Sequence, residues 1–166
     1  MAEFLVSGPH VVPIYQGKNG RIVREEEGRS FFAHHPSLAT KRGCYIFAMR
    51  SGGGITPTYV GKAAKSFGQE CFTAHKLGKC NQTLVDYGQG TLVVFLFEPS
   101  AIKGKPPILE IGLLENFLIQ TALSVNDALL NVKQTKQATW SVRGIIRSGA
   151  GKPSKSASLA KSMLGL

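Results

Sequence analysis

The sequence predicts an α+β domain in which helices cover a mainly antiparallel sheet. The predicted elements follow the order strand, strand, helix, strand, helix, and their connections are short. Strands and helices therefore do not alternate as they would in a parallel sheet built from βαβ units. A chain of 166 residues that is 43% hydrophobic is long enough to bury one core.

The first half of the chain predicts an extension, a hairpin and a helix. Residues 1–35 mix short apolar runs with turn residues, which is typical of a hairpin-like extension. Residues 43–50 and 58–62 are apolar and aromatic, and the Gly- and Pro-containing loop between them favours an antiparallel pair. Residues 63–79 have the composition of a helix that ends near Gly78.

The second half predicts a central strand and the longest helix. Residues 91–98 are apolar on both faces, as in a central strand, and two prolines precede a long helix over 108–125. Residues 139–149 predict a late strand or an extended arm, and a short helix closes the tail. The domain organisation has three parts: an N-terminal extension packed on the core (1–35), a core domain (36–135) and a basic C-terminal arm (136–166).

The charge of the chain is one-sided. Twenty Lys and Arg residues face ten Asp and Glu residues, for a formal net charge of +10, and no acidic residue follows Asp127. Such a positive field favours a polyanion, because phosphate contacts dominate the affinity for nucleic acids. We expect a DNA partner, or RNA, with Arg143, Arg147 and Lys152 on backbone phosphates; the alternative is a solvated basic tail.

Composition also argues against several classes of protein. No uninterrupted apolar run approaches 18 residues, and the N-terminus lacks the pattern of a secretory signal. Three cysteines provide no disulfide framework. We therefore expect a cytoplasmic protein with no membrane partner, and no feature indicates a protein partner or a homodimer.

Glu115 is the most unusual charged residue of the sequence. On the predicted helix its neighbours one turn away are apolar: Ile111, Leu118, Ile119 and Ala122. An ionised carboxylate there costs several kcal/mol unless it is paired or bound to a metal. Glu115 is therefore a structural ion-pair partner or a hydrogen-bonded acid, or else a ligand of a hard cation or a general base.

The stretch PTYVGK at 57–62 ends in Gly-Lys, as a nucleotide-binding loop does. Such a loop also needs a glycine five residues before Gly61 and a Ser or Thr after Lys62. Thr56 and Ala63 stand at these positions, so the spacing rejects a nucleotide loop.

Four segments together resemble the GIY-YIG nuclease superfamily: Gly43-Cys44-Tyr45, Tyr59-Val60-Gly61-Lys62-Ala63, the segment Leu114-Glu115-Asn116-Phe117-Leu118-Ile119, and Leu130-Asn131. Within it they are similar to the nuclease domain of the bacterial nucleotide-excision-repair endonuclease, and the resemblance covers residues 41–132. It implies a small, three-stranded antiparallel central sheet flanked by helices. It also implies an endonuclease that hydrolyses DNA phosphodiesters with one divalent metal, Mg²⁺ or Mn²⁺.

The resemblance assigns roles to five residues. Tyr45 matches the first motif tyrosine, a base or water-positioning group, and Tyr59 the second, which orients the nucleophile or the scissile phosphate. Glu115 matches the metal-binding glutamate, Asn131 the asparagine that follows its helix, and His75 a histidine that some members carry. A tyrosine hydroxyl, with an ordinary pKa of about 10, needs a nearby cation or metal to act as a base at neutral pH.

One position departs from the family pattern. The family places an arginine four residues before the histidine, and here Cys71 stands there. Either Lys62 or Lys76 supplies the missing charge, as a point charge rather than a bidentate fork. Otherwise the protein is a noncatalytic DNA-binding module on the same fold; an RNA-cleaving nuclease is the third alternative.

A zinc site is a competing interpretation of the cysteines. Cys71 and His75 are four residues apart, a ligand spacing on one helix face, and Cys44 and Cys80 would complete the set. No Cys-x-x-Cys pair supports it, and buried, inert cysteines are commoner.

Overall fold

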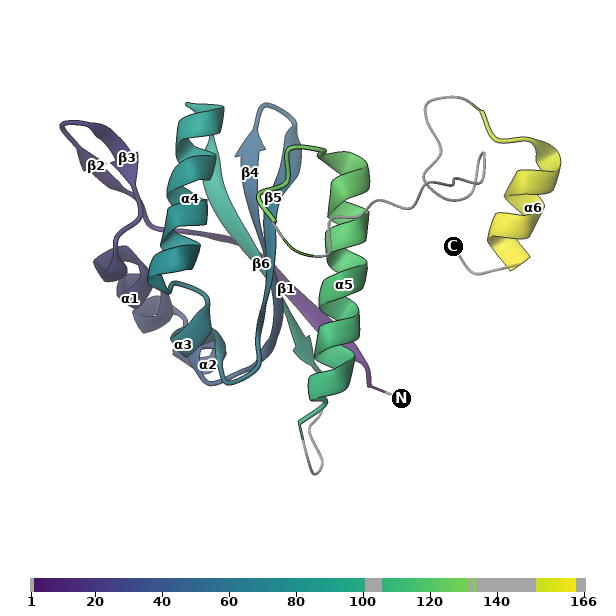
Figure 1. Cartoon of the computed structure of the whole chain (residues 1–166), viewed down its shortest axis with the longest axis horizontal. Coiled ribbons are helices and arrows are strands. Elements are labelled where there is room, and N and C mark those ends of the chain that lie inside the picture. The colour runs from purple at the N-terminus through teal and green to yellow at the C-terminus, as the bar shows by residue number, and fades with distance from the viewer. Residues whose placement is uncertain (1, 101–105, 132, 134–151, 164–166) are drawn as a thin grey trace. The chain divides into compact units, whose positions relative to one another are not determined.

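An antiparallel sheet of four strands forms the centre of the fold (Figure 1). The computed structural model describes residues 2–100, 106–131, 133 and 152–163. The chain divides into two compact units, residues 1–135 and 136–166, and the sheet belongs to the first. Its strand order is β1-β6-β4-β5, with β1 at Phe4–Val11, β4 at Gly43–Ser51, β5 at Gly54–Ala63 and β6 at Thr91–Pro99.

The structure confirms the α+β class, but the expected sheet of three strands is wrong. The fourth strand is β1, which comes from the N-terminal extension and pairs with β6, so that Phe4 lies opposite Pro99 and Val11 opposite Val93. This pairing makes β6 an inner strand, as its apolar faces predict. The hairpin expected in the extension is a separate two-stranded sheet of β2 (Tyr15–Gly17) and β3 (Gly20–Ile22).

The helix predicted over 108–125 is confirmed, whereas the helix predicted over 63–79 on the other side of the sheet is not. The first unit contains α1 (Glu25–His34), α2 (Pro36–Ala39), α3 (Phe67–Glu70), α4 (Ala74–Tyr87) and α5 (Ile108–Val125). Helix α5 spans the predicted residues. The single helix expected over 63–79 is wrong, because Thr73 is extended (φ −66°, ψ 161°) and caps the start of a separate helix α4, which continues through Gly78 to Tyr87.

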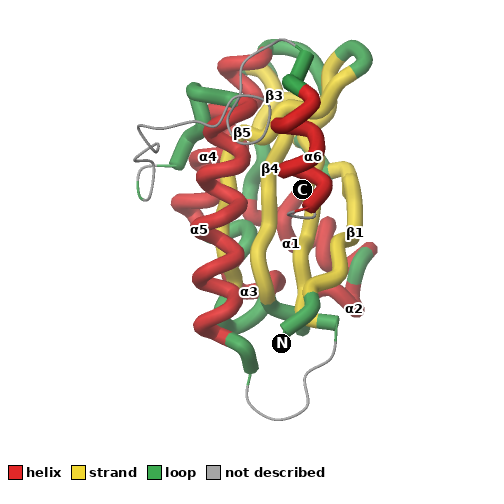
Figure 2. The backbone as a smooth tube through the Cα atoms, turned by 90° about the vertical axis from the view of Figure 1, so that its right-hand side faces the viewer, coloured by secondary structure: helices red, strands yellow, loops and turns green. Residues whose placement is uncertain are grey.

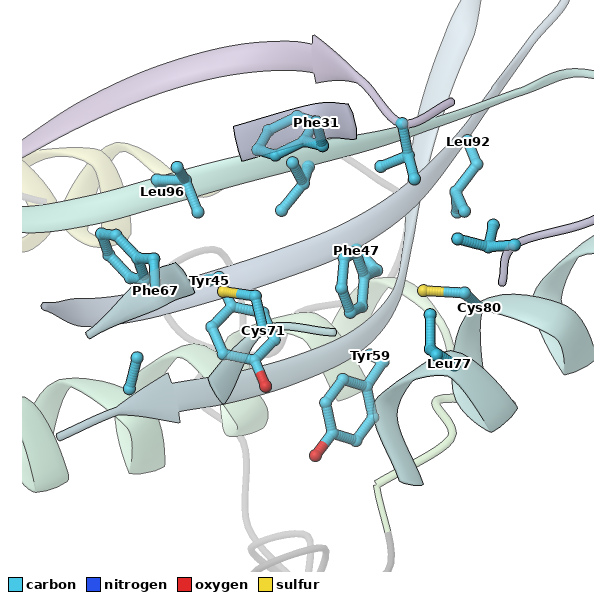
Figure 3. Close-up of a cluster of buried hydrophobic side chains, with 14 of the residues drawn as sticks. Phe31, Tyr45, Phe47, Tyr59, Phe67, Cys71, Leu77, Cys80, Leu92 and Leu96 are labelled. Atoms are coloured by element: carbon cyan, nitrogen blue, oxygen red, sulfur yellow. The ribbon is translucent and has the colours of Figure 1, made fainter. Parts of the chain in front are cut away.

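The sheet separates two apolar cores, with α4 and α5 on opposite sides of it (Figures 1 and 2). Successive side chains of a strand point to opposite faces, so Tyr45, Phe47 and Tyr59 pack with α1, α3 and α4 (Figure 3). Cys44 and Val60 pack on the other face against α5. The α5 residues in this second core are Ile111, Leu118, Ile119, Ala122 and Leu123.

Helix α5 also has the length and hydropathy that a membrane span requires, alone among the described helices. A helix that lies on the core of a soluble protein meets the same criteria. In this structure its Ile111, Leu118, Ile119 and Ala122 side chains are buried in the core beneath the sheet.

A bulge in the β4–β5 hairpin sets the position of Tyr59. Phe47 pairs with Tyr59 but the next residue, Ala48, pairs with Pro57, so Thr58 is the extra residue. The buried Thr58 hydroxyl donates to the Phe47 carbonyl at 3.2 Å and accepts from Thr83 on α4 at 3.0 Å. These hydrogen bonds pair the buried Thr58 hydroxyl at the bulge, and they anchor β5 to α4 immediately before Tyr59.

The outer edge of β5 is covered by the segment that follows α5. The Leu130 amide donates to the Thr58 carbonyl at 2.8 Å. The Asn131 side chain then accepts from the Val60 amide at 2.9 Å and donates to the Val60 carbonyl at 2.8 Å. Asn131 therefore satisfies backbone groups that an edge strand would leave open.

The second unit contributes one described helix, α6 (Lys155–Met163). It agrees with the short helix expected at the end of the tail. The strand or extended arm expected over 139–149 lies outside the described residues.

Candidate functional site

A cavity of about 560 Å³ lies at strand β5 and takes its walls from both α4 and α5. Tyr59 belongs to the face of β5 that packs with α4, whereas Lys62 reaches α5. The cavity therefore lies across the edge strand and draws residues from both faces of the sheet. The described residues that line it are Tyr59, Lys62, His75, Lys76, Lys79, Glu115, Ile119, Asn131 and Lys133.

Tyr59 and Lys76 form the α4 side of the site. The Lys76 ammonium donates a hydrogen bond to the Tyr59 hydroxyl oxygen and lies 4.7 Å from the centre of the Tyr59 ring. Lys76 lies in the first turn of α4, which contains no acidic residue, and the exposed His75 precedes it. Because Lys76 donates to the tyrosine oxygen, the phenolic O–H remains free to donate to another group.

Glu115 and Lys62 form the α5 side of the site. The Lys62 ammonium lies 2.9 Å from a Glu115 carboxylate oxygen, and the Glu115 side chain is only 15% exposed while that of Lys62 is 45% exposed. The expectation that Glu115 faces the apolar side of α5 is confirmed by its buried neighbours Ile111, Leu118 and Ile119. The carboxylate is ion-paired in this state, one of the arrangements that the sequence left open.

Tyr45 does not line this cavity, but its ring centre lies 6.4 Å from that of Tyr59, which does. Its side chain is fully buried, and its hydroxyl has no hydrogen-bond partner among the described residues. Burial, with smaller contributions from Cys71 and Tyr59, raises the pKa of Tyr45 far above its ordinary value, so the hydroxyl stays neutral. Figure 3 shows both tyrosine hydroxyls directed to the same side of the apolar cluster.

Gly61 explains how Tyr45 fits. The two residues are direct cross-strand partners, and a methyl group at Gly61 would lie 2.5 Å from the Tyr45 hydroxyl oxygen. The Gly-x-Tyr and Tyr-x-Gly stretches therefore interlock, because the tyrosine ring of one crosses the glycine of the other.

The nucleic-acid contacts expected from the sequence fall into three groups. Lys62 lines the cavity and is ion-paired, whereas Asn131 lines it but uses its amide on the backbone of Val60. Lys152 is exposed in the second unit. Arg143 and Arg147 lie outside the described residues.

Two cationic cavity residues, Lys79 and Lys133, were missed by sequence reasoning, as was the apolar Ile119. Lys79 follows Lys76 by three positions on α4, so helical spacing could have placed it on the same face. Lys133 offers no such signal, because its position depends on the turn after α5. Neither lysine has an ion-pair or hydrogen-bond partner among the described residues.

The cysteines do not assemble as a zinc site would require. Cys71 and Cys80 lie in the core on the α4 side, whereas Cys44 lies on the α5 side and donates its thiol to the Ile111 carbonyl at 3.2 Å. Burial raises the pKa of Cys44 to about 12 and also raises the pKa values of Cys71 and Cys80. The thiols are therefore neutral in the folded protein. Cys71 is the C-terminal cap of α3, whereas His75 lies in the first turn of α4. The two residues therefore do not share a helix face.

The donor groups of the cavity fit a hard divalent cation only in part. Among the described residues no group of three His, Cys, Asp or Glu side chains gathers as in an all-protein metal site. Mg²⁺, however, is commonly held by one or two carboxylates together with water and substrate phosphates. The Glu115 carboxylate in an open cavity suits that second kind of site.

Comparisons of the chain with models of protein families, with curated proteins and with solved structures found no match. The cavity and its side chains are therefore the features from which a function can be inferred.

Proposed function

We propose that the protein is a divalent-metal-dependent DNA endonuclease that hydrolyses phosphodiester bonds in the cavity on β5. One observation carries the proposal. A single cavity combines a lysine-bonded tyrosine hydroxyl, a mostly buried carboxylate and several further cationic side chains.

The cavity suits an anionic phosphodiester. Lys76, Lys79 and Lys133 would stabilise the negative charge that develops on the phosphate oxygens during attack. Tyr59 would orient the attacking water or a phosphate oxygen through its free O–H, and Lys76 fixes the direction of that hydroxyl. Glu115 would hold Mg²⁺ or Mn²⁺, which supplies further charge neutralisation when bound.

The proposed roles of the two tyrosines differ from those that the family resemblance implied. Tyr59 takes the water-positioning role, because its hydroxyl reaches the cavity. Tyr45 has a structural role in the proposal, because it is buried and neutral and its ring packs against Gly61 of strand β5.

The first prediction concerns nicking of supercoiled plasmid DNA by the pure full-length chain with Mg²⁺ or Mn²⁺. We expect Glu115→Gln and Tyr59→Phe each to lower the initial rate by about 10²-fold or more, since each removes a group that acts on the reacting phosphate. Tyr45→Phe should keep the rate within about threefold, because it removes only a buried hydroxyl that has no hydrogen-bond partner among the described residues.

Glu110→Gln is the matched control, because Glu110 lies on the same helix but is exposed and away from the cavity. The enzyme proposal is wrong if the wild type nicks neither supercoiled, linear nor single-stranded DNA with either metal. Equal losses in Tyr45→Phe and Tyr59→Phe would instead contradict the division of roles.

A noncatalytic DNA-binding module is the second candidate, and Cys71 favours it. The residue at the family's arginine position is buried and uncharged, so it brings no cation to the site. Electrophoretic mobility shifts separate the candidates: a module binds DNA with equal affinity with and without Mg²⁺, and never nicks it. Repeating both assays with RNA tests the RNA-cleaving alternative.

A further inference from the structure

Glu115 is the only acidic residue among the described residues that line the cavity. It faces four lysines there, Lys62, Lys76, Lys79 and Lys133, so the cavity as a whole is cationic. A free divalent cation would meet this positive field, which opposes its entry. A phosphate group, in contrast, is attracted to it.

The carboxylate is also directly engaged. Lys62 lies 2.9 Å from one Glu115 oxygen, and the side chain of Glu115 is mostly buried, which limits the directions from which another cation can approach. A second positive ion on the same carboxylate would stand within a few ångströms of the Lys62 ammonium. Their repulsion weakens the binding of a cation for as long as Lys62 remains in place.

The Lys62 side chain has room to turn away from Glu115 and toward the cavity. Nearly half of its side chain is exposed, it lines the cavity, and a lysine carries its charge on a flexible four-carbon stem. A phosphate bound in the cavity would offer its oxygens to the same ammonium, so Lys62 could leave the carboxylate without losing an anionic partner.

From these three observations we infer that Lys62 is a positioning residue that occupies Glu115 in the free protein and passes to a substrate phosphate on binding. The carboxylate then becomes free for a divalent cation only when a nucleic acid is present. This inference rests on the proposed function, because it specifies the order in which that site accepts its two ligands.

The test is a titration of the full-length protein with Mn²⁺, in which the electron paramagnetic resonance signal of free Mn²⁺ gives the dissociation constant. The nucleic-acid probe is a single-stranded 12-nucleotide DNA with phosphorothioate linkages, which resist hydrolysis, and titration of the DNA alone corrects for its own Mn²⁺. We expect the DNA to tighten Mn²⁺ binding by the wild type about tenfold or more.

Variants isolate the role of Lys62 without DNA. Lys62→Gln should bind Mn²⁺ about fivefold more tightly than the wild type, the upper range for removing one partly exposed ion pair. Lys62→Arg should keep the weak binding of the wild type because it keeps the charge. Lys65→Gln is the matched control: it removes the same charge three residues away, at an exposed position outside the cavity, and should change the affinity by less than twofold. Glu115→Gln in the Lys62→Gln background should abolish the gain.

Two outcomes overturn different claims. Equal Mn²⁺ affinities of the wild type and Lys62→Gln without DNA would overturn the role of Lys62, and the nuclease proposal would still stand on the nicking assay. If the wild type with DNA and Glu115→Gln with DNA bind Mn²⁺ equally, Glu115 holds no cation, and the proposed function fails as well.

Discussion

Gly61 and Tyr45 show how a single pair of residues shapes the edge of the site. Tyr45 crosses its cross-strand partner Gly61, and this packing leaves the tyrosine hydroxyl buried without a partner among the described residues. The spacing of the motifs identified both tyrosines, but it could not predict that Tyr45 is fully buried while Tyr59 lines the cavity. That difference arises from the bulge at Thr58 and from the missing side chain at Gly61, which are features of the folded hairpin.

The second prediction concerns Gly61→Ala. The added methyl group would collide with the Cζ carbon and the hydroxyl of Tyr45, so we expect the free energy of unfolding to fall by about 1–3 kcal/mol, as overpacking in a core does. Urea denaturation measures it. The double variant Gly61→Ala/Tyr45→Leu should lose less than the sum of the two single variants, because leucine lacks both the Cζ carbon and the oxygen that the methyl group would meet; losses that are simply additive would contradict the collision.

Helix α4 shows how far local sequence signals define an element. Gly78 looked like a helix end, yet it lies in the middle of α4, where an added Cβ would meet no atom within 4 Å. The helix continues because Leu77, Cys80 and Leu84 bury one face in the core. Tertiary burial therefore overrides the local preference of glycine.

The third prediction follows from that position. Gly78→Ala should raise the free energy of unfolding by about 0.5–1 kcal/mol, because alanine loses less backbone entropy in a helix than glycine does. Urea denaturation measures this gain as well. A destabilised Gly78→Ala variant would show that glycine is required there.

Helix α1 begins with an ion pair that makes stability depend on pH. Glu27 accepts hydrogen bonds from the backbone and the guanidinium of Arg24, at 2.9, 3.0 and 2.9 Å. The side-chain hydrogen bond from Arg24 is the main cause that lowers the pKa of Glu27 to about 2. A carboxyl group with a lowered pKa stabilises the fold above its unfolded pKa of about 4.5 and loses this contribution as the pH falls toward 2.

The fourth prediction is that Glu27→Gln flattens the pH dependence of stability between pH 4.5 and 2. At neutral pH the variant should lose about 1 kcal/mol, a discounted value because Arg24 is 39% exposed. Thermal unfolding at a series of pH values measures both effects. Glu25→Gln, at a 70% exposed position in the same turn, should follow the wild-type curve.

Some features of the whole molecule can be predicted from the pattern of apolar residues in the sequence, whereas others depend on contacts between distant segments of the folded chain. The α+β class and the long helix α5 follow from hydrophobic periodicity. The strand β1 was missed because Gly8 and Pro9 interrupt its apolar residues, and it becomes a strand only by pairing with β6 more than 80 residues away. The cavity likewise joins residues from 59 to 133, which strand order and helix packing bring together.

The fifth prediction concerns the basic charge of the whole chain, which is +10 and concentrated after Asp127. Arg143, Arg147 and Lys152 changed together to Gln should weaken DNA binding similarly for all sequences. They should also reduce the slope of log affinity against log salt by about two to three, since each phosphate contact contributes about 0.7–0.9. Fluorescence anisotropy at several salt concentrations measures the slope, and an unchanged slope would mean that these residues make no phosphate contacts.

The amide of Asn131 has a consequence for how the assembly of the site can be observed. Because the side chain of Asn131 accepts from the Val60 amide, that N–H is protected only while the chain after α5 stays against β5. Deuterium exchange at Val60 therefore reports how often this segment detaches. It monitors one wall of the cavity at the level of a single proton, with no substrate, cation or enzymatic turnover in the experiment.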